Sequence, residues 1–383
     1  MHEQAFMKTN KVGVLGGGQL GRMLIESGKK MGLTYHVLES HVDCPAAMGA
    51  EKLELGSLQS ATDIEKLAEE ADVLTIEIEK VNAKALQALK EKGKVVIPDP
   101  QSILIIQNKA RQRQYLAQHS ISQPAFFVQK AHQSFESHQF VQFSNRQKVV
   151  LKFLEGGYDG KGVQIWPIQE LEAQSFEQDL LVEDCIQPLE EYAILVAKGK
   201  EKMTSFPIVK MVVHEKGNLL DHLEMPAQTH QAEDLKKTAL AAVEALPGLG
   251  LFAVEMFADG SNVYLNEIAP RPHNSGHQSI HNCTYSQYDQ LNFLLKGQNP
   301  KLPKMHSASV MMNLLGPEGW EGNYFYQGQE EINQMQQVHL YDYGKSISKP
   351  QRKLGHLTLW GDDLLTLRKT LKELKQKVKV LPA

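Results

Sequence analysis

Cysteine is scarce in this 383-residue sequence, which contains only Cys44, Cys185 and Cys283. The three lie far apart and fit no metal-binding spacing, so reduced thiols in a cytoplasmic protein are expected rather than a disulfide framework. Long hydrophobic runs are also missing. No segment approaches the roughly 18 apolar residues of a membrane span, and the first residues lack the apolar stretch of a signal peptide. These absences favour a cytoplasmic protein with no membrane partner.

A strong charge of either sign is absent as well. The sequence has 41 Lys and Arg against 45 Asp and Glu, a formal net charge of −4. Such a balance gives no general attraction to nucleic acid, so no nucleic-acid partner is expected. Lysines and one arginine between residues 368 and 379 follow a helical pattern in which leucines face inward, which is typical of a solvated helix face. The length allows two or three domains.

Residues 11–107 alternate strand and helix patterns. Strands are expected at 11–15, 34–39, 73–78 and 94–97, with helices at 22–31, 64–71 and 82–92, which is typical of a parallel α/β domain. The first turn satisfies G-x-G-x-x-G at Gly16, Gly18 and Gly21, and Glu39 sits where a ribose-binding acid would. The pattern is compatible with a dinucleotide. Free N–H groups at a helix start also bind other phosphates, so an NAD-dependent oxidoreductase is one alternative among several.

A second glycine-rich turn, residues 156–162, lies between expected strands at 148–154 and 163–166. Four glycines in seven residues cost conformational entropy, which a plain hairpin would avoid. They suit a loop whose backbone N–H groups surround a polyphosphate while Lys152 and Lys161 neutralise its charge. The Walker A pattern is absent. A mobile surface hairpin is the alternative.

Residues 252–257 and 262–267 alternate apolar side chains around Asp259-Gly260, which predicts a hairpin. Folding at this turn brings Glu255 roughly opposite Glu267. Two carboxylates at cross-strand distance repel each other unless a cation lies between them. Mg²⁺ takes one or two carboxylates together with phosphate oxygens, so the pair predicts a magnesium site. A solvated strand face is the alternative.

A polar cluster follows this hairpin. Arg271, His273, Asn274 and His277 suit anionic oxygens, so the whole stretch predicts a phosphoryl-transfer site. His273, His277 and His281 would also align as a zinc site if the segment were helical. The intervening Asn-Ser-Gly is a poor helix former, which disfavours zinc.

The remaining segments predict an antiparallel sheet and a small final module. Strands are expected at 125–128, 180–186, 191–197 and 204–213, and helices at 108–120, 134–143 and 238–245. The final module has expected strands at 307–314, 337–341 and 356–360 before a C-terminal helix. Arg352 and Lys353 place two cations just before the last strand.

This order of motifs resembles the ATP-grasp superfamily, in which two α+β subdomains hold ATP between them. Within it, residues 16–23, 156–162, 266–277 and 352–356 are similar to the N5-carboxyaminoimidazole ribonucleotide synthetases of purine biosynthesis, a match that runs from about residue 11 to 375. The resemblance implies a mixed α/β and α+β fold in four parts. These are a Rossmann-like pre-ATP-grasp domain (1–107), a lid subdomain (108–183), an antiparallel-sheet ATP-grasp core with the metal site (184–303) and a small C-terminal β/α module (304–383).

The resemblance also implies the site residues. Glu255 and Glu267 would bind Mg²⁺, with Mn²⁺ as a substitute, and the catalytic residues would be Arg271, His273, Lys152 and Asp159. The ribonucleotide would contact Gly18, Gln19, Leu20, Tyr158, Lys161, Asn274, Arg352 and Lys353. ATP would contact Lys109, Lys152, Gly157, Tyr158, Asp159, Gly160, Lys161, Gly162, Val163, Glu183, Asp184, Cys185, Ile186, Glu191, His214, Asn266 and Glu267. Two departures are notable: Lys109 stands where some members have Arg, and Asp184-Cys185 replaces other residues of the adenine hinge.

The implied reaction joins ATP, bicarbonate and 5-aminoimidazole ribonucleotide through carboxyphosphate to give N5-carboxyaminoimidazole ribonucleotide, ADP and phosphate. A homodimer is expected by the same resemblance. The nearest alternative is the formate-dependent glycinamide ribonucleotide transformylase, also an ATP-grasp enzyme with a Pro-Arg-Pro-His segment. A catalytically inactive nucleotide-binding regulator is a further alternative, although each predicted catalytic position carries a chemically competent residue.

Overall fold

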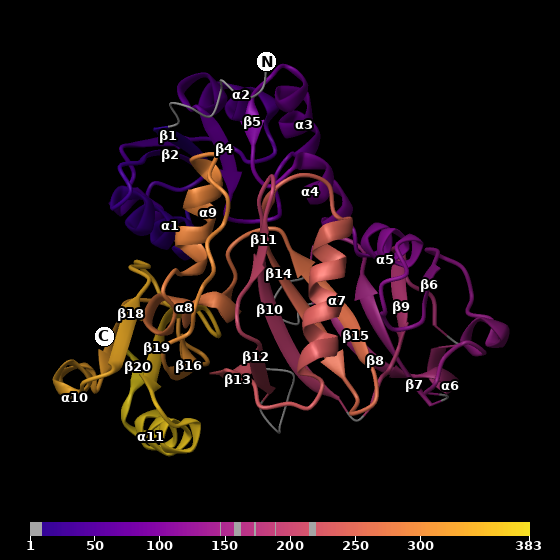
Figure 1. Ribbon diagram of the computed structural model, residues 1–383. Helices are drawn as coiled ribbons and strands as arrows, with labels where there is room; N and C mark the ends of the chain where they lie inside the picture. The colour runs from indigo at the N-terminus through magenta and orange to yellow at the C-terminus, as the bar shows by residue number, and fades with distance from the viewer. Residues whose placement is uncertain (1–9, 146, 157–161, 172–173, 188, 214–219) are drawn as a thin grey trace.

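The computed structural model describes residues 10–145, 147–156, 162–171, 174–187, 189–213 and 220–383 (Figure 1). Four regions are visible: an N-terminal α/β domain, a small sheet beside α5, a large central sheet, and a C-terminal region that extends the central sheet (Figure 1). Among the described residues, no helix combines the length and the apolar character needed to span a bilayer.

The N-terminal domain is a five-stranded parallel sheet in the order β3-β2-β1-β4-β5, as the alternating pattern predicts. Its strands are β1 (Lys11–Leu15), β2 (Thr34–Glu39), β3 (Lys52–Leu55), β4 (Val73–Ile76) and β5 (Val95–Val96). Its helices are α1 (Gln19–Lys29), α2 (Ala61–Glu70) and α3 (Ala83–Glu91), with a 3-10 turn at η2 (Pro45–Met48). The short edge strand β3 was not expected, because its Lys-Leu-Glu-Leu sequence is too polar and brief to predict a strand.

Two helices, α4 (Pro100–Ile106) and α5 (Lys109–Gln118), lead into a four-stranded antiparallel sheet in the order β6-β9-β7-β8. Its strands are β6 (Phe126–Gln129), β7 (Lys148–Phe153), β8 (Val163–Pro167) and β9 (Leu180–Asp184), and α6 (Ile168–Leu171) follows β8. The helix predicted at 134–143 is wrong: only η3 (Ser137–Phe140) is helical there. Phe135, Phe140 and Phe143 instead pack into the core of this small sheet from an irregular segment.

The central sheet has nine strands, and strands predicted for the small C-terminal module continue it. Its order is β15-β14-β10-β12-β13-β16-β19-β18, with β11 paired to β10. The members are β10 (Glu190–Lys198), β11 (Met203–Ser205), β12 (Val209–Val213), β13 (Leu220–Met225), β14 (Gly250–Ala258), β15 (Val263–Ala269), β16 (Ala308–Leu315), β18 (Val338–Asp342) and β19 (Lys353–Gly361). The single strand expected at 204–213 divides at Phe206-Pro207, since proline cannot donate to a strand ladder. β13 joins β16, so the C-terminal strands continue the core sheet.

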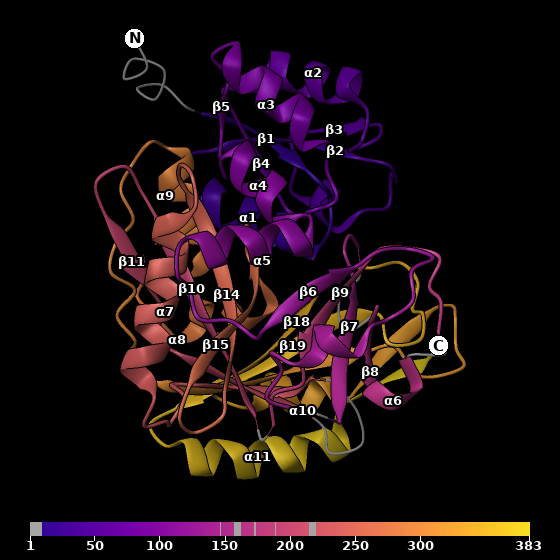
Figure 2. The ribbon, with the colours of Figure 1, turned by 90° about the vertical axis from the view of Figure 1, so that its right-hand side faces the viewer.

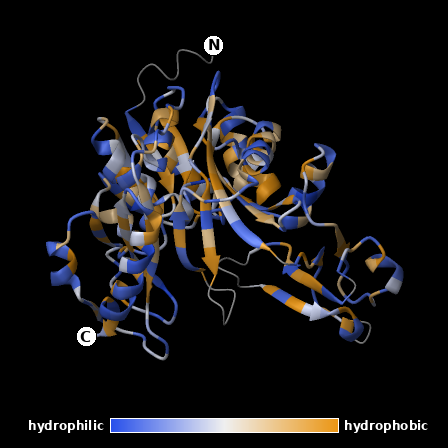
Figure 3. Cartoon of the chain, turned by 60° about the horizontal axis from the view of Figure 1, so that its bottom comes forward, coloured by the Kyte–Doolittle hydropathy of each residue, from blue (hydrophilic) through white to orange (hydrophobic). Residues whose placement is uncertain are grey.

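Helices cover the central sheet and join it to its neighbours (Figures 1 and 2). Tyr35 on β2 donates to Asn292 at 2.6 Å, which ties the N-terminal domain to α9. Hydrophobic residues concentrate along the long central strands (Figure 3). The remaining elements are α7 (Ala232–Ala245), η4 (Asn274–Gly276), α8 (Ser279–Asn282), α9 (Gln287–Leu295), β17 (Tyr324–Gln327), α10 (Gln329–Gln334), α11 (Leu364–Lys377) and β20 (Lys379–Pro382). α11 packs on β16 and β19, and β17 pairs with β20.

Candidate active site

The hairpin of β14 and β15 carries the paired carboxylates. Glu255 and Glu267 are register partners, as the Asp-Gly turn predicts, and a bulge lies directly after Glu255. The Glu267 carboxylate lies 3.6 Å from the ammonium of Lys109, the first residue of α5. The Glu255 carboxylate lies 3.4 Å from Nε2 of His273. Each acid therefore has a basic neighbour.

This donor set fits a hard divalent cation. Two carboxylates on adjacent strands, next to the amide of Asn266, offer oxygen ligands, and Mg²⁺ commonly completes such a shell with phosphate oxygens and water. The zinc alternative fails on geometry. His277 stacks on His356 and His281 stacks on Trp360, and no three His, Cys, Asp or Glu side chains gather as metal ligands within the described residues.

A buried ionic cluster lies behind the hairpin. The Lys152 ammonium on β7 contacts the Glu183 carboxylate on β9 at 2.7 Å and donates to the Asn266 side-chain oxygen at 2.9 Å. The other Glu183 oxygen meets the Arg113 guanidinium at 2.6 Å. Burial alone would raise the pKa of Glu183, but Arg113 and Lys152 outweigh it and lower the pKa to about 2. Lys152 is therefore held by an ionised carboxylate and directed at the residue that precedes Glu267.

His273 is fixed as a neutral imidazole. Burial, assisted by the charges of Arg271 and Lys353, holds the pKa of His273 well below its usual range. Its Nδ1 accepts from the Ser275 backbone N–H at 3.3 Å, which leaves the proton on Nε2, the nitrogen that faces Glu255. Gln287 accepts from the His273 N–H and donates to the His273 carbonyl, both at 2.8 Å. His273 can therefore donate a hydrogen bond but carries no charge near neutral pH.

Arg271 is positioned by the N-terminal domain. Its Nε lies 2.8 Å from the carboxylate of Glu79, which follows β4. The neighbouring Asn274 is 9% exposed, and neither polar atom of its side chain has a partner among the described residues. Arg271 and Asn274 together give this corner a fixed cation and an unused amide, both suited to a small polar anion.

The first glycine loop is already occupied by carboxylates of the protein. Glu39 accepts from the Gly17 N–H at 2.8 Å, and Glu77 accepts from the Gly21 N–H at 3.2 Å. A Cβ at Gly18 would lie 2.7 Å from the Glu77 carboxylate. Because these acids use the amides that a dinucleotide pyrophosphate needs, the geometry argues against NAD. Glu77 and Glu79 were not identified from the sequence, although their position after a parallel strand was a usable signal.

Comparison with known proteins finds similar sequences over most of the chain. Three family models match: the ribonucleotide synthetase preATP-grasp domain at residues 7–107, the ATP-grasp domain at 114–288, and the phosphoribosylaminoimidazole carboxylase C-terminal domain at 309–370. The N5-carboxyaminoimidazole ribonucleotide synthase of Synechococcus elongatus is 34% identical over 367 residues, covering 94% of this chain and 91% of that protein. The chain belongs to the N5-carboxyaminoimidazole ribonucleotide synthase family. The enzyme of the same name from Staphylococcus epidermidis is 32% identical, covering 92% of this chain and 93% of that one.

Solved structures of the family have the same fold. The Thermotoga maritima synthetase matches with a TM-score of 0.86 and 30% identity, covering 98% of this chain and all of that one. The Aspergillus clavatus synthase in complex with ADP and 5-aminoimidazole ribonucleotide matches with a TM-score of 0.83 and 26% identity, covering 96% and 98% of the two chains. The predicted ATP-grasp architecture with a preATP-grasp domain is confirmed.

Some residues that this family's motifs suggest for ATP have other contacts here. The Asp184 carboxylate accepts from the backbone N–H groups of Ser144 and Asn145 at 2.7 and 3.0 Å, so its side chain faces that turn. The Cys185 carbonyl accepts from the Asn145 amide at 3.0 Å. Burial raises the pKa of Glu191 on β10, and the nearby charge of Lys152 opposes the shift. Ile186 is buried beside Cys185.

The predicted ribonucleotide residues approach from two modules. Gln19 and Leu20 begin α1, where backbone N–H groups precede the first helical hydrogen bonds. Gly18 is the N-cap of this helix, and its N–H donates to Glu77. Lys353 lies close enough to lower the pKa of both His273 and His277, whereas Arg352 donates to the Ile347 carbonyl at 2.7 Å. Lys353 therefore lies near His273 and His277, whereas Arg352 bonds to its own loop.

The lid loop is described only at its two ends. Gly162, with φ of +84°, accepts from the Phe153 N–H at 3.2 Å, and Val163 begins β8 opposite Lys152. The Leu154 carbonyl accepts from the Lys109 N–H at 2.8 Å, which anchors the loop to the start of α5. The other predicted positions, namely Gly157, Tyr158, Asp159, Gly160, Lys161 and His214, lie outside the described residues.

Proposed function

We propose that this chain catalyses the ATP- and bicarbonate-dependent carboxylation of 5-aminoimidazole ribonucleotide to N5-carboxyaminoimidazole ribonucleotide, with release of ADP and phosphate, in purine biosynthesis. Membership of the synthase family carries the proposal. The geometry supports it, because the β14–β15 hairpin carries the paired carboxylates of Glu255 and Glu267. Lys152 contacts this hairpin at Asn266, and His273 contacts it at Glu255. None of the relatives named above is the formate-dependent transformylase.

The nucleotide would lie between the four-stranded sheet and the central sheet. Lys109 and Lys152 would neutralise the phosphates, Glu191 would bind the ribose, and backbone groups of residues 183–186 would meet the adenine. Glu255 and Glu267 would hold Mg²⁺, or Mn²⁺ in its place, which supplies positive charge to the phosphate oxygens when bound. Lys152 is well placed to neutralise the phosphates, since it is buried and donates to Asn266, next to Glu267.

In the first step, a bicarbonate oxygen would attack the γ-phosphorus of ATP, forming carboxyphosphate and releasing ADP. Arg271 would hold the bicarbonate, because its planar fork matches a planar oxyanion and Glu79 fixes its orientation. Neutral His273 would donate from Nε2 to a developing anionic oxygen. Asp159 and Lys161 of the lid loop would help to exclude water, because carboxyphosphate hydrolyses readily.

In the second step, the exocyclic amine of the ribonucleotide would attack the carboxyl carbon of carboxyphosphate, or of CO₂ released from it. A C–N bond forms and the amine loses a proton. Phosphate leaves in the same step when carboxyphosphate is attacked, or beforehand when carboxyphosphate breaks down to CO₂. The ribonucleotide would be bound by the start of α1, Tyr158, Asn274 and the cations Arg352 and Lys353. The unused amide atoms of Asn274 and the approach of Lys353 to His273 support this placement.

The test is ADP release with Mg-ATP and bicarbonate, measured with and without 5-aminoimidazole ribonucleotide. Strong stimulation by the ribonucleotide is expected, and chelation of the divalent cation should abolish it. Glu267→Gln should abolish turnover with the fold intact, and Lys353→Ala should raise the KM for ribonucleotide more than the KM for ATP. Stimulation only by glycinamide ribonucleotide with formate would contradict the proposal.

The proposal includes a cytoplasmic homodimer that needs no nucleic acid or membrane. Light scattering on the purified chain tests the dimer, for which a mass of twice 43.0 kDa is expected. A mass that stays at one chain over a wide concentration range would contradict it.

A further inference from the structure

Arg113 on α5 is one of the most deeply buried charged side chains of the described chain, with 2% of its surface exposed. Its Nε contacts the Glu183 carboxylate on β9 at 2.6 Å. Its Nη1 donates to the Leu265 carbonyl on β15 at 2.7 Å. One guanidinium therefore joins the small sheet to the central sheet, directly behind Lys152 and Asn266, which are themselves joined at 2.9 Å.

Two buried cations share the carboxylate of Glu183. One of its oxygens contacts Arg113 and the other contacts Lys152. Arg113 therefore takes up part of the Glu183 charge, and Glu183 neutralises Lys152 less completely than it would in a simple Lys–Glu pair. The other acids that act on Lys152 are Glu267 and Glu191, which are the residues proposed for Mg²⁺ and the ribose.

The ionisation of the cluster agrees with this division. Burial lowers the pKa of Lys152, the charge of Arg113 adds to the lowering, and the charges of Glu183 and Glu267 oppose both. The depressed pKa of Glu183 shows that its carboxylate stays charged in the folded protein. An anionic ligand beside Lys152 would relieve the repulsion between the two cations.

We infer that Arg113 is a positioning residue for the nucleotide. It shares the charge of Glu183, so that Lys152 keeps more of its own charge for the phosphates, and it joins β9 to β15 through its contacts with Glu183 and Leu265. The inference rests on the proposed function only in taking a nucleotide polyphosphate as the anion.

A purely structural role for Arg113 makes a different prediction. If Arg113 only closes a buried ion pair, its loss lowers stability, and nucleotide affinity changes only as far as the fold is disturbed. If it cancels Glu183, its loss weakens nucleotide binding, and removing the Glu183 charge as well restores that binding. Arg113→Gln is the sharp variant, because glutamine keeps a donor for the Leu265 carbonyl but loses the charge. Arg113→Lys keeps the charge but loses the fork.

The experiment measures the Kd of Mg-ADP by calorimetry and the unfolding temperature under the same conditions. We expect Arg113→Gln to raise the Kd about tenfold or more and Arg113→Lys to raise it less. The double variant Arg113→Gln/Glu183→Gln should return to within about threefold of the wild type. Arg111→Met is the matched control, since Arg111 lies on the same helix, is exposed and donates to the Leu104 carbonyl, and it should leave the Kd unchanged.

Unchanged affinity in Arg113→Gln, or a double variant as weak as the single one, would overturn the inference. If the single variant Arg113→Gln does not fold, the double variant decides. A Kd of Mg-ADP near the wild-type value in the double variant supports the inference, and a clear rise in that Kd overturns it. Failure of the proposed function has another signature: ADP binding would follow these expectations while 5-aminoimidazole ribonucleotide would not stimulate ADP release.

Discussion

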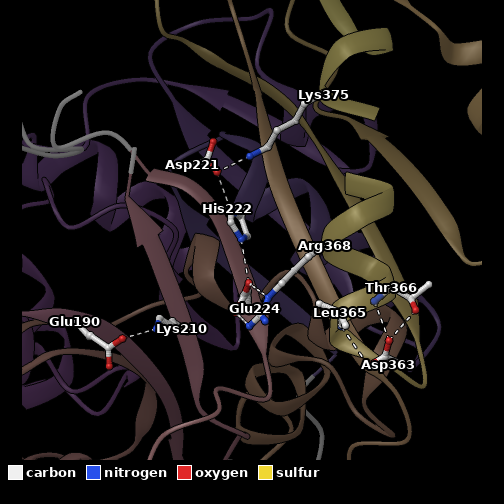
Figure 4. A network of polar contacts seen from close by, with 10 residues as sticks. All are labelled: Glu190, Lys210, Asp221, His222, Glu224, Asp363, Leu365, Thr366, Arg368 and Lys375. Atoms are coloured by element: carbon white, nitrogen blue, oxygen red, sulfur yellow. Dashed lines mark hydrogen bonds and ion pairs between the residues drawn. The ribbon is translucent and has the colours of Figure 1, made fainter. Parts of the chain in front are cut away.

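Two ionic clusters of this protein are built from the same residue types but have different roles. The cleft cluster, Arg113, Glu183 and Lys152, is closed to solvent, with side-chain exposures of 2%, 2% and 8%. The helix cluster joins β13 to α11 and is partly open, with side-chain exposures from 5% to 40% (Figure 4). Its members are Asp221, His222, Glu224, Arg368 and Lys375.

The difference lies in the balance of charge. In the helix cluster each cation has its own carboxylate: Arg368 meets both oxygens of Glu224 at 2.6 Å, and Lys375 meets Asp221. His222 lies between the two acids, 2.7 Å from Asp221 and 3.1 Å from Glu224. This cluster is complete by itself and attaches a helix. In the cleft cluster two cations share the carboxylate of Glu183, and the other acids that act on Lys152 are the two proposed to bind Mg²⁺ and the ribose, Glu267 and Glu191.

The largest expected effect breaks the cleft cluster. Lys152→Met removes the cation that faces the nucleotide, and we expect ADP formation to fall by about two to three orders of magnitude. Steady-state kinetics with the ribonucleotide present measures it. Lys375→Met is the matched control, because it removes a lysine that also pairs with a carboxylate but lies on α11. Equal losses in both variants would show that the two clusters do not differ as described.

The next effect breaks the helix cluster. Arg368 and His222 overcome the effect of burial and lower the pKa of Glu224 to about 2, from an ordinary value of 4.5. This group therefore stabilises the fold above about pH 5, and the stabilisation is lost as the pH falls toward 2. We expect Glu224→Gln to lower the free energy of unfolding by about 2 kcal/mol at pH 7 and by less at pH 3.

Urea unfolding at the two pH values measures this difference. Glu330→Gln, at an exposed acid of α10, is the control and should change neither value. ADP formation by Glu224→Gln should stay within about twofold of the wild type, because the helix cluster supplies no charge to a ligand. A large loss of activity in Glu224→Gln would contradict the purely structural role of the helix cluster.

A third effect sharpens the comparison, because acid stability also depends on buried histidines. Burial, assisted by His339, lowers the pKa of His281 to about 4, below the ordinary 6.5. Its contribution is complete above about pH 6.5 and is lost as the pH falls toward 4, since the unfolded chain takes up the proton first. His281→Phe keeps the stack on Trp360 and removes the titration. We expect its loss of stability between pH 7 and 5 to be smaller by about 1–2 kcal/mol.

Thermal or urea unfolding across that range measures the change, with exposed His138→Gln as the control. If the pH dependence of stability in His281→Phe equals that of the wild type, His281 is not its cause, and the carboxylates of the two clusters account for the loss of stability in acid.

The smallest expected effect is at the edge of the helix cluster. Lys375 and Asp221 keep 30% and 26% of their side-chain surfaces exposed, so solvent and salt weaken their attraction. Lys375→Met should lower the free energy of unfolding by less than about 1 kcal/mol, and added salt should reduce the difference from the wild type. A loss as large as that of Glu224→Gln would mean that the helix cluster is as strongly coupled as the cleft cluster.

Local pattern was sufficient for much of the site. The Asp-Gly turn and its flanking alternation predicted the register of Glu255 and Glu267, because a tight turn determines cross-strand pairs. The early βαβ rhythm predicted the parallel sheet, although not the short polar strand β3. The helix expected at 134–143 failed because its phenylalanines gain more from packing in the small sheet than from helical periodicity.

The contacts that join distant segments could not be read in this way. Arg113, Glu183 and Lys152 are spread over some seventy residues, and nothing in their spacing shows that they meet. Glu39 and Glu77 fill a loop that, by pattern alone, invites a dinucleotide. The pairing of β16 with β13, which continues the central sheet into the C-terminal strands, has no signal in the local pattern either.

The sequence by itself thus determined the kinds of elements, the carboxylate pair and, by resemblance, the family, since these depend on short-range pattern and on motifs. Only the tertiary structure decided which charges meet, which amides are already used and which cation remains available, because electrostatic energy depends on distance and burial, and both are set by the packing of segments far apart in the chain.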